Sequence, residues 1–225
     1  MSWIVHHGDC LEILPTLGKV DAVVTDPPYS DATHDGARTG AIGGEHLVDF
    51  SSISIDELRA VLGACAAITE RWVVATMDWR HVAELAKEPP GGLRFVRFGV
   101  WVKPNGAPQF TGDRPGQGWE AVAFMHRDGV KLEWNGGGRS SVFTIPKENT
   151  NHPTGKPVRL LRDFCRLFAN KGSTILDPFC GSGSTGVAAL AEGMNFIGIE
   201  REAKYVEIAR RRIAAEAAQG KLEFT

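Results

Sequence analysis

The chain has 225 residues, of which 43% are hydrophobic and 23% are charged, and its formal net charge is -2. These values are typical of a soluble globular protein and exclude a globally basic DNA-binding protein. No apolar run approaches the roughly 20 residues of a membrane-spanning helix, and the first residues, MSWIVHHGDC, form no secretory signal, so we expect a cytoplasmic protein.

Charged residues are unevenly distributed along this nearly neutral chain. Residues 1–60 hold ten acidic and three basic side chains, whereas residues 147–171 hold six basic and two acidic ones. The basic stretch is either a set of phosphate contacts or a solvated helix face. The four cysteines form no C-x-x-C pair and the histidines have no metal-ligand spacing, so we expect free thiols and no metal.

Short apolar segments bounded by turn residues alternate with helical patterns along the chain. This alternation predicts an α/β fold with a mostly parallel sheet whose strands are buried on both faces. The predicted strands are Ala22–Thr25, Trp72–Thr76, Phe95–Val102, Ala121–His126, Ser173–Leu176 and Asn195–Ile199. The predicted helices are Ile55–Thr69, Arg80–Lys87, Pro157–Asn170, Ser184–Glu192 and Ala203–Gln219. Ser54 and Glu57 have the spacing of a capping box at the start of the first helix.

The first motif, Asp26-Pro27-Pro28-Tyr29, follows an apolar strand. The two prolines fix φ and remove two backbone donors, so the carbonyl groups of this turn stay available as acceptors. The Asp26 carboxylate and the Pro27 carbonyl can both accept hydrogen bonds from one NH2 group, and the Tyr29 ring offers a face on which a base can stack. Alternatively, the motif is only a rigid turn with a packed tyrosine.

These groups suit the methylation of an exocyclic amine. The nitrogen of such an amine is a poor nucleophile because its lone pair is delocalised into the ring. Two acceptors on its protons favour a tetrahedral geometry that restores the lone pair, and catalysis then consists mainly of positioning and electrostatics. Since an amine inside a duplex is out of reach, the target base would have to be flipped out.

Three segments rich in Gly, Pro or polar residues are predicted to be long loops, namely Asp31–Asp49, Lys103–Trp119 and Asn135–Pro153. Loops of this length in a compact domain often carry function, although plain connectors are the alternative. We expect them to be the short recognition elements of a single domain that spans residues 1–225.

The second motif lies in the segment from Ser173 to Glu200, which combines a strand, a glycine-rich turn, a helix, a second strand and an acid. Gly181, Gly183 and Gly186 have G-x-G-x-x-G spacing, in which glycine allows a sharp turn and a close approach of the backbone to a ligand. The helix N-terminus would face the bound group, and Glu200 could accept hydrogen bonds from both hydroxyls of a ribose. The pattern predicts a nucleoside cofactor, with a tight turn that binds no ligand as the alternative.

The same pattern fits NAD, so an NAD-dependent oxidoreductase is one alternative function. Two features favour S-adenosylmethionine. Only 25 residues follow Glu200, which we expect to leave no room for a second mononucleotide-binding half. In addition, Asp177 in the turn can lie beside an ammonium group, which S-adenosylmethionine has and NAD lacks. A non-catalytic DNA-binding protein with a vestigial cofactor fold is a further alternative.

The Asp26–Tyr29 motif and the later segment DPFCGSGST together resemble the motifs of the beta-class DNA amino-methyltransferases, in which the catalytic motif precedes the cofactor motif. The resemblance covers nearly the whole chain and implies a doubly wound, Rossmann-like methyltransferase sheet with permuted motif order. It assigns Asp26, Pro27, Pro28 and Tyr29 to catalysis on the target base. It implies a cofactor site made of Asp9, Cys10, His152, Thr154, Lys156, Asp177, Phe179, Gly181, Ser182, Gly183, Glu200 and Arg201.

A pocket for the DNA or its base would be formed by Ser30, His34, Arg38, Lys103 and Glu120. Of these, Lys103 and Glu120 are similar to residues of the strand–loop–strand unit that lines the base pocket in the family. His34 and Arg38 could touch phosphate or the orphaned base, or they are solvated loop residues.

The identity of the target base follows from the residue at position 26. Family members with Ser in the place of Asp26 tend to methylate cytosine N4, so the resemblance favours adenine N6, with cytosine N4, RNA and a protein amide as alternatives. Many relatives carry a sizeable recognition segment, whereas only 20 residues, Asn135 to Thr154, separate the last strand pair from the cofactor segment here. Recognition is therefore short, relaxed, placed on the Asp31–Asp49 loop, or supplied by a partner or a dimer. We expect DNA as the partner and a restriction-modification setting, and both a monomer and a homodimer remain open.

Overall fold

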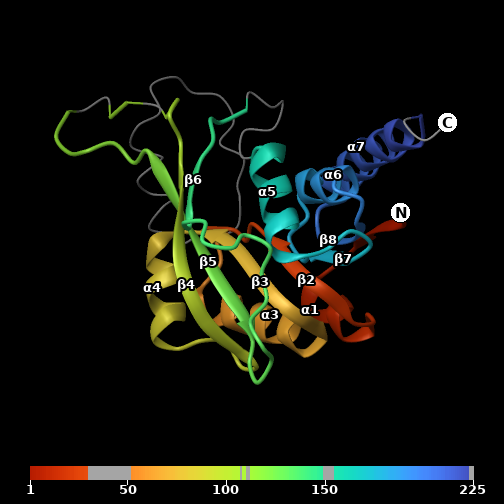
Figure 1. The fold of residues 1–225 in the computed structure, drawn as a ribbon, viewed down its shortest axis with the longest axis horizontal. Coiled ribbons are helices and arrows are strands. Elements are labelled where there is room, and N and C mark those ends of the chain that lie inside the picture. The colour runs from red at the N-terminus through yellow and green to blue at the C-terminus, as the bar shows by residue number, and fades with distance from the viewer. Residues whose placement is uncertain (30–51, 107, 110–111, 149–154, 223–225) are drawn as a thin grey trace.

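The computed structural model describes residues 1–29, 52–106, 108–109, 112–148 and 155–222, and these residues form an eight-stranded sheet with helices on both faces (Figure 1). The strands are β1 (Trp3–His7), β2 (Val20–Thr25), β3 (Thr69–Met77), β4 (Leu93–Val102), β5 (Trp119–Arg127), β6 (Val142–Thr144), β7 (Thr174–Asp177) and β8 (Asn195–Glu200). The predicted site residues Ser30, His34, Arg38, His152 and Thr154 and the predicted loop Asp31–Asp49 lie outside the described residues.

The strands lie in the order β1-β8-β7-β2-β3-β5-β4-β6. Neighbouring strands are parallel except that β5 runs antiparallel to both β3 and β4. From β2 the chain continues outward to β3 on one side, and from β7 it continues outward to β8 on the other side. The sheet is therefore doubly wound, as predicted, and its strand order reverses between β2 and β7.

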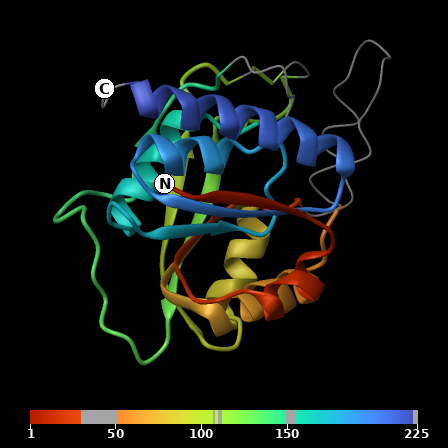
Figure 2. The same ribbon diagram turned by 90° about the vertical axis from the view of Figure 1, so that its right-hand side faces the viewer.

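Two layers of helix cover the sheet (Figure 2). One layer contains α1 (Cys10–Ile13), the 3-10 turn Leu14–Thr16, α3 (Ile55–Ile68) and α4 (Trp79–Lys87). The other layer contains α5 (Val158–Phe168), α6 (Ser184–Ala191) and α7 (Ala203–Leu222). Within the described ranges, no helix has the length and apolar character needed to cross a membrane.

The prediction of strands buried on both faces holds for the central strand β2 but not for β4, where Arg97 and Phe98 are exposed. Ala22 and Val24 belong to the core that contains α5, α6 and α7, whereas Val23 belongs to the core that contains α3. All three side chains are fully buried. Because helices cover both faces, neither face of the strand can be polar, and burial of each valine contributes about 1.5–3 kcal/mol.

The capping box predicted before α3 is confirmed. The Ser54 hydroxyl accepts a hydrogen bond from the Glu57 N–H at 3.2 Å, and the Glu57 carboxylate accepts one from the Ser54 N–H at 2.9 Å. Two helix-end donors are thereby satisfied, which stabilises the helix by about 1 kcal/mol.

Several short elements escaped the sequence analysis. The predicted strands and helices are all present, with ends that differ by a few residues, but β1, α1 and β6 were not predicted. The prediction of Asn135–Pro153 as a loop was wrong in part, because β6 lies within it, and the loop predicted from Lys103 ends where β5 begins at Trp119. The three residues of β6 are held by parallel pairing with β4, from Val100↔Val142 onward, and a strand this short has no periodicity to detect.

The strand directions bring chemically active residues to one edge of the sheet. The carboxyl ends of β1, β2, β3, β4, β7 and β8 share this edge with the start of β5, as the strand registers require. Ligands of doubly wound sheets bind at this edge, at the point where the strand order reverses. Asp26 follows β2 and Asp177 ends β7, so the two predicted motifs meet at that point.

Candidate active site

Asp26 stands at the carboxyl end of β2, and its side chain is 25% exposed. The Thr76 hydroxyl, from β3, donates to Oδ1 of Asp26 at 2.6 Å. The Lys156 ammonium group, from the segment before α5, donates to Oδ2 of Asp26 at 2.6 Å. Both carboxylate oxygens are therefore held, and the orientation of the carboxylate relative to the sheet is fixed.

Asp26 belongs to a group of five side chains, which we name the Asp26 cluster and which consists of Asp26, Tyr29, Lys103, Glu120 and Lys156. Lys156 also lies 3.2 Å from Glu120, and Glu120 accepts hydrogen bonds from the Lys103 ammonium group and the Tyr29 hydroxyl. The side chains of Lys103 and Lys156 are each 9% exposed and that of Glu120 is 13% exposed. The two negative charges of the carboxylates are thus neutralised by the two positive charges of the ammonium groups, with little contribution from water.

The pKa values in the Asp26 cluster follow from burial and from these ion pairs. Burial raises the pKa of Asp26 above its usual value, although Lys156 opposes the shift. Burial also acts against a charged Glu120, but Lys156 and Lys103 outweigh it and bring the Glu120 pKa down to about 2. For Lys156, burial is outweighed by Asp26 and Glu120, which raise its pKa. Burial and the two carboxylates raise the pKa of Tyr29, so its hydroxyl stays protonated as a donor.

Lys156 was predicted among the cofactor residues. Its ammonium group contacts Asp26, 130 residues away in sequence, and joins the predicted pocket residues Lys103 and Glu120. The physical reason is that α5 packs against β2, so the segment before α5 passes over the carboxyl end of that strand.

The Asp26–Tyr29 turn is anchored at both ends. Pro27 is buried and Pro28 is partly buried, and the Tyr29 carbonyl accepts a hydrogen bond from the Ile53 N–H at 3.3 Å. The Tyr29 hydroxyl is fixed by Glu120, and the Lys156 ammonium group lies 5.1 Å from the centroid of the Tyr29 ring. The face of this ring is thus a defined part of the site.

Asp177 forms the second half of the site at the end of β7. It is 2% exposed, and its Oδ1 accepts hydrogen bonds from the Thr25 hydroxyl at 2.7 Å and from the Phe179 N–H at 3.1 Å. Burial raises its pKa to about 6, against opposing hydrogen bonds that include one from Thr185. Among the described residues no Lys or Arg side chain pairs with this buried carboxylate, so it is suited to receive a cationic group of a ligand.

The three glycines of the predicted turn differ in what surrounds them. A Cβ on Gly183 would lie 2.9 Å from Ala209 of α7, and a Cβ on Gly186 would lie 2.5 Å from Ile213. Those two positions serve close packing of helices. A Cβ on Gly181 would meet nothing nearer than 3.9 Å, and its φ is +50°. The open space at Gly181 is therefore where a ligand can approach the backbone.

Glu200, at the end of β8, closes this turn. Its carboxylate accepts hydrogen bonds from the N–H groups of Gly181 and Glu202, both at 2.8 Å. Its carbonyl accepts one from the Gly8 N–H at 3.0 Å, which brings the predicted Asp9-Cys10 segment beside it. The position of the carboxylate is therefore set by the backbone on both sides.

Two predicted cofactor residues, Asp9 and Ser182, also have roles in the fold. The Asp9 carboxylate caps α1 by accepting from the Leu11 N–H at 2.7 Å. Burial raises the pKa of Cys10 to about 11, so its thiol stays protonated. The carbonyl and hydroxyl of Ser182 accept from the Arg212 guanidinium group of α7 at 2.7 and 2.8 Å. Arg201 is an exposed residue beside Glu202.

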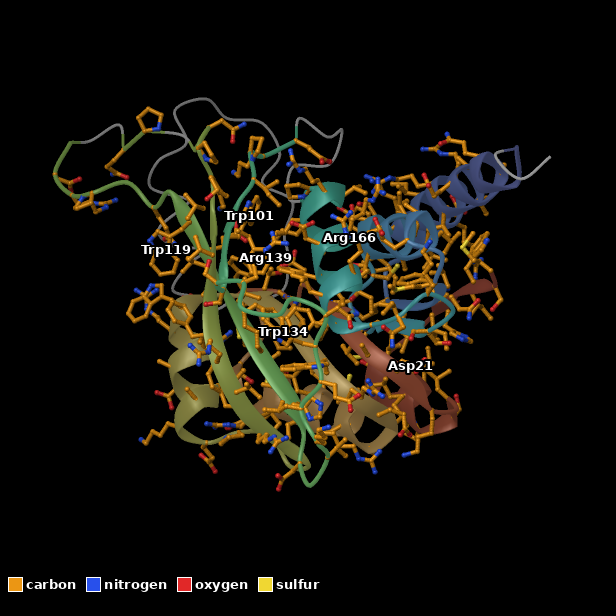
Figure 3. All side chains as sticks on the ribbon, viewed as in Figure 1. Asp21, Trp101, Trp119, Trp134, Arg139 and Arg166 are labelled. Atoms are coloured by element: carbon orange, nitrogen blue, oxygen red, sulfur yellow. The ribbon has the colours of Figure 1, made fainter. Side chains whose placement is uncertain are left out.

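The basic stretch 147–171 is not an uninterrupted open surface. Lys156 belongs to the Asp26 cluster, and Arg162 donates to Glu192 of α6 at 2.6 Å. Arg166 and Arg139, both labelled in Figure 3, pair with the Asp163 carboxylate of α5. These pairs favour a structural role for Arg162 and Arg166 over phosphate contacts.

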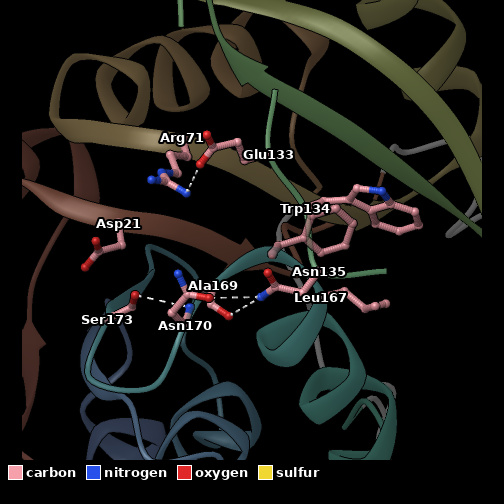
Figure 4. Close-up of a pocket in the computed structure, with 10 residues that line it drawn as sticks. Asp21, Arg71, Glu133, Trp134, Asn135, Leu167, Ala169, Asn170 and Ser173 are labelled. Atoms are coloured by element: carbon pink, nitrogen blue, oxygen red, sulfur yellow. Dashed lines mark hydrogen bonds and ion pairs between the residues drawn. The ribbon is translucent and has the colours of Figure 1, made fainter. Parts of the chain in front are cut away.

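A small pocket lies at the other end of the strands (Figure 4). It holds about 70 Å³ and is lined by residues that include Asp21, Arg71, Glu133, Asn135 and Asn170. Its polar groups satisfy one another, since Arg71 pairs with Glu133 at 3.0 Å and Asn135 donates to the side-chain oxygen of Asn170 at 3.2 Å. Because Asp21 is at the start of β2, this pocket is separate from the site at Asp26.

Three threonines that hold the site were missed by the sequence analysis, namely Thr25, Thr76 and Thr185. A polar residue at the end of an apolar strand was the signal for the first two. Trp101, near the end of β4 and two residues before Lys103, is 1% exposed and donates to the Ile145 carbonyl at 2.7 Å, so it belongs to the core. No group of three or more His, Cys, Asp or Glu side chains in the described part of the chain has an arrangement that could hold a metal ion.

Three known proteins and one family model resemble this chain over most of its length. The family model, N6_N4_Mtase, is described as DNA methylase and matches residues 20–211. The protein YubD of Escherichia coli (strain K12) is 31% identical over 219 residues, which cover 92% of this chain and 88% of YubD. Type II methyltransferase M2.DpnII of Streptococcus pneumoniae is 26% identical over 245 residues, which cover 95% of this chain and 90% of M2.DpnII. The crystal structure of the M1.HpyAVI-SAM complex matches with a TM-score of 0.73 at 27% identity, covering 93% of this chain and 99% of that chain.

Proposed function

The chain belongs to the N6_N4_Mtase family of DNA methylases, and we propose that it transfers a methyl group from S-adenosylmethionine to adenine N6 of a flipped base in DNA. Membership in this family sets aside the NAD-dependent oxidoreductase and the non-catalytic DNA-binding protein. The observation that carries the proposal is the contact between the two motifs: Thr25 donates to Asp177, and the next residue along the chain is Asp26.

The base half of the site, made of Asp26, Pro27, Tyr29 and Thr76, has the acceptors needed to bind an exocyclic amine. Asp26 and the Pro27 carbonyl accept hydrogen bonds from the two protons of the target NH2 group, and Thr76 holds the Asp26 carboxylate in place. The two acceptors pull the nitrogen towards a tetrahedral geometry and restore its lone pair. The ring of Tyr29, fixed by Glu120, carries the base by stacking. These residues act by positioning and by electrostatics.

The cofactor half fits S-adenosylmethionine on three points. The open space at Gly181 admits a nucleoside against the backbone, since a Cβ there would meet nothing nearer than 3.9 Å. The buried Asp177 carboxylate is complementary to an amino-acid ammonium group, and the Glu200 carboxylate is oriented at the end of β8 to accept from ribose hydroxyls. M1.HpyAVI, a protein of similar fold, was crystallised as a SAM complex.

When bound, S-adenosylmethionine supplies an electrophilic methyl group on a sulfonium. The chain's own part is to bring the amine and this group together, because β2 and β7 are neighbours and their carboxyl ends carry Asp26 and Asp177. The hydrogen bonds from Thr25 and Phe179 fix the Asp177 carboxylate, so the cofactor half is held in place beside the base half when the amine attacks in line.

Adenine is the base that position 26 favours. Relatives with Ser at this position tend to methylate cytosine N4, and this chain has Asp. A cytosine N4 amine presents the same NH2 group to the same acceptors, so that product would keep the mechanism and change only the base.

The setting of the enzyme follows from its relatives. M2.DpnII is named a type II methyltransferase, which supports a place for this chain in a restriction-modification system. We also propose that residues 1–225 act as one methyltransferase domain, since one sheet carries both motifs. Recognition of the DNA sequence then rests on the loops around this sheet edge.

Mass spectrometry of nucleosides tests the proposal. The full-length protein is incubated with S-adenosylmethionine and unmethylated genomic DNA, which offers every short sequence, and the DNA is then digested. N6-methyladenine is the expected product, and the Asp26→Ala variant should give none. N4-methylcytosine would replace the proposed base, and the absence of both products from double and single strands would overturn DNA as the substrate.

A further inference from the structure

The Lys156 ammonium group lies where the target base should bind. It donates to Oδ2 of Asp26 at 2.6 Å, while Oδ1 of the same carboxylate accepts from the Thr76 hydroxyl. An exocyclic amine must donate to the same carboxylate. A carboxylate oxygen can accept two hydrogen bonds, but an ammonium group and an NH2 group are donors of similar size, so the two compete for the space beside Oδ2.

The same ammonium group is also close to the face of Tyr29. It lies 5.1 Å from the centroid of the Tyr29 ring, within the range of a cation–π contact. A base stacked on that ring would need this space. One cation therefore stands at both features that we assign to the binding of the base.

Lys156 has a second partner within reach. Its Nζ lies 3.2 Å from Oε2 of Glu120, so a small rotation of a flexible side chain is enough to transfer the ammonium group from one carboxylate to the other. Glu120 is ready to receive it, because Lys103 and Lys156 keep the Glu120 pKa at about 2 despite burial. The shift moves no proton and leaves the net charge of the Asp26 cluster unchanged.

We propose that Lys156 is a positioning residue that fills the place of the target amine on Asp26 before DNA binds and moves to Glu120 when the base binds. This inference rests on the proposed function. In the enzyme without DNA, Lys156 pairs with the Asp26 carboxylate and opposes the rise of its pKa. In the complex, Glu120 holds the displaced ammonium group beside the base.

Three variants separate this role from a purely structural one. Lys156→Met removes the cation, Lys156→Arg keeps it, and Glu120→Gln removes the charge that receives it. Lys131→Met is the matched control, because Lys131 follows β5 at the other end of the strands and its side chain is 86% exposed. Transfer of labelled methyl groups to unmethylated genomic DNA gives kcat and KM across a pH series, and thermal unfolding checks that each variant is folded.

The pH profile is the first readout. The ionisable groups that face Asp26 are Lys156, Glu120 and Tyr29 in the cluster and Asp177 at the end of β7. Without Lys156, burial and Glu120 raise the pKa of Asp26 against the hydrogen bond from Thr76 alone. The acid limb of kcat/KM should move up by at least one pH unit in Lys156→Met and should return to its wild-type position in Lys156→Arg, while Lys131→Met should match the wild type. A carbon-13 titration without DNA should likewise give a higher pKa for the Asp26 carboxyl in Lys156→Met than in the wild type, Lys156→Arg or Lys131→Met.

The split between kcat and KM is the second readout. Above the acid limb, the KM for DNA should fall at least threefold in Lys156→Met, because no cation has to be displaced. It should rise at least tenfold in Glu120→Gln, because Lys156 has lost its second partner. The Lys156→Met/Glu120→Gln double variant should have the KM of Lys156→Met, because without the Lys156 ammonium group the charge of Glu120 no longer affects DNA binding.

Two results would overturn the inference while leaving the proposed function intact. One is a Lys156→Met/Glu120→Gln double variant whose fold-change in KM equals the product of the fold-changes of the two single variants. The other is a Lys156→Met variant with an unmoved acid limb and a weakened affinity for S-adenosylmethionine, which would make Lys156 a cofactor residue. A wild-type protein that methylates no base would instead overturn the proposed function, and the inference with it.

Discussion

The hydroxyl of Thr25 donates a 2.7 Å hydrogen bond to the carboxylate of Asp177. Thr25 is the last residue of β2 and Asp177 is the last residue of β7, so this bond ties together the ends of two strands that are 152 residues apart in sequence. Through it, the base half and the cofactor half of the site keep a fixed separation.

Replacement of Asp26 should separate chemistry from cofactor binding. Asp26→Asn keeps the shape but weakens an acceptor, and we expect kcat to fall by about 10²–10³-fold, the range for loss of one preorganised electrostatic contact. The affinity for S-adenosylmethionine, measured by calorimetry, should change less than threefold. Asp56→Asn on α3, whose side chain is 90% exposed, is the control and should match the wild type. Full activity of Asp26→Asn would contradict the mechanism.

Thr76 should matter for activity through the orientation of Asp26. Thr76→Val is nearly isosteric and removes the hydroxyl that donates to Asp26, so kcat/KM should fall about fivefold, which corresponds to about 1 kcal/mol. Thr69→Val, at the other end of β3, removes an equally buried hydroxyl that donates to the Cys65 carbonyl at 2.6 Å. The control should lose stability but keep its kcat/KM, and equal activity in both variants would argue against a role for Thr76.

Asp177 should make the protein less stable as the pH rises. Its pKa is 3.8 when unperturbed and about 6 in the folded state, so its contribution to stability is fully present below pH 3.8 and is lost as the pH rises through 6. The difference of about two pKa units corresponds to about 3 kcal/mol. Asp177→Asn should therefore be more stable than the wild type at pH 7.5, by urea denaturation, and this advantage should shrink towards pH 4.

Asp177→Asn should also bind S-adenosylmethionine at least tenfold more weakly, because the ammonium group of the cofactor loses its carboxylate.

Glu120→Gln should show the opposite dependence of stability on pH. The Glu120 pKa is lowered to about 2, so the stabilisation by Glu120 is lost only as the pH falls towards that value. If the difference in unfolding free energy between the wild type and Asp177→Asn is the same at pH 4 and at pH 7.5, the raised pKa of Asp177 is refuted.

The glycines of the turn should divide into packing and binding positions. Gly186→Ala places a Cβ 2.5 Å from Ile213, and we expect it to destabilise the protein by about 1–3 kcal/mol while the folded fraction still binds cofactor. Gly181→Ala places a methyl group in open space, so the loss of stability should be about 1 kcal/mol, from its positive φ, and the cofactor affinity should fall at least tenfold. Calorimetry and urea denaturation of both variants measure the two effects, and the reverse pattern would exclude a ligand at Gly181.

The sequence determined the local features of this protein. The run VDAVVT predicted a strand buried on both faces, Ser54 and Glu57 predicted a capping box, and the spacing of Gly181 and Gly183 before Ser184 predicted a strand–turn–helix unit. Each of these depends on the backbone preferences of a few neighbouring residues, and such preferences can be recognised along the chain.

Only the tertiary structure decided which distant residues meet. The sequence carries no signal that Lys156 pairs with Asp26, because that contact depends on strand order and on the path of the segment before α5. The pairing of the three-residue strand β6 with β4 and the burial of Trp101 are likewise set by neighbours far away in sequence. The physical reason is that such contacts are stabilised by packing of the whole sheet, whereas the motifs Asp26–Tyr29 and Asp177–Gly183 are shaped by their own backbone.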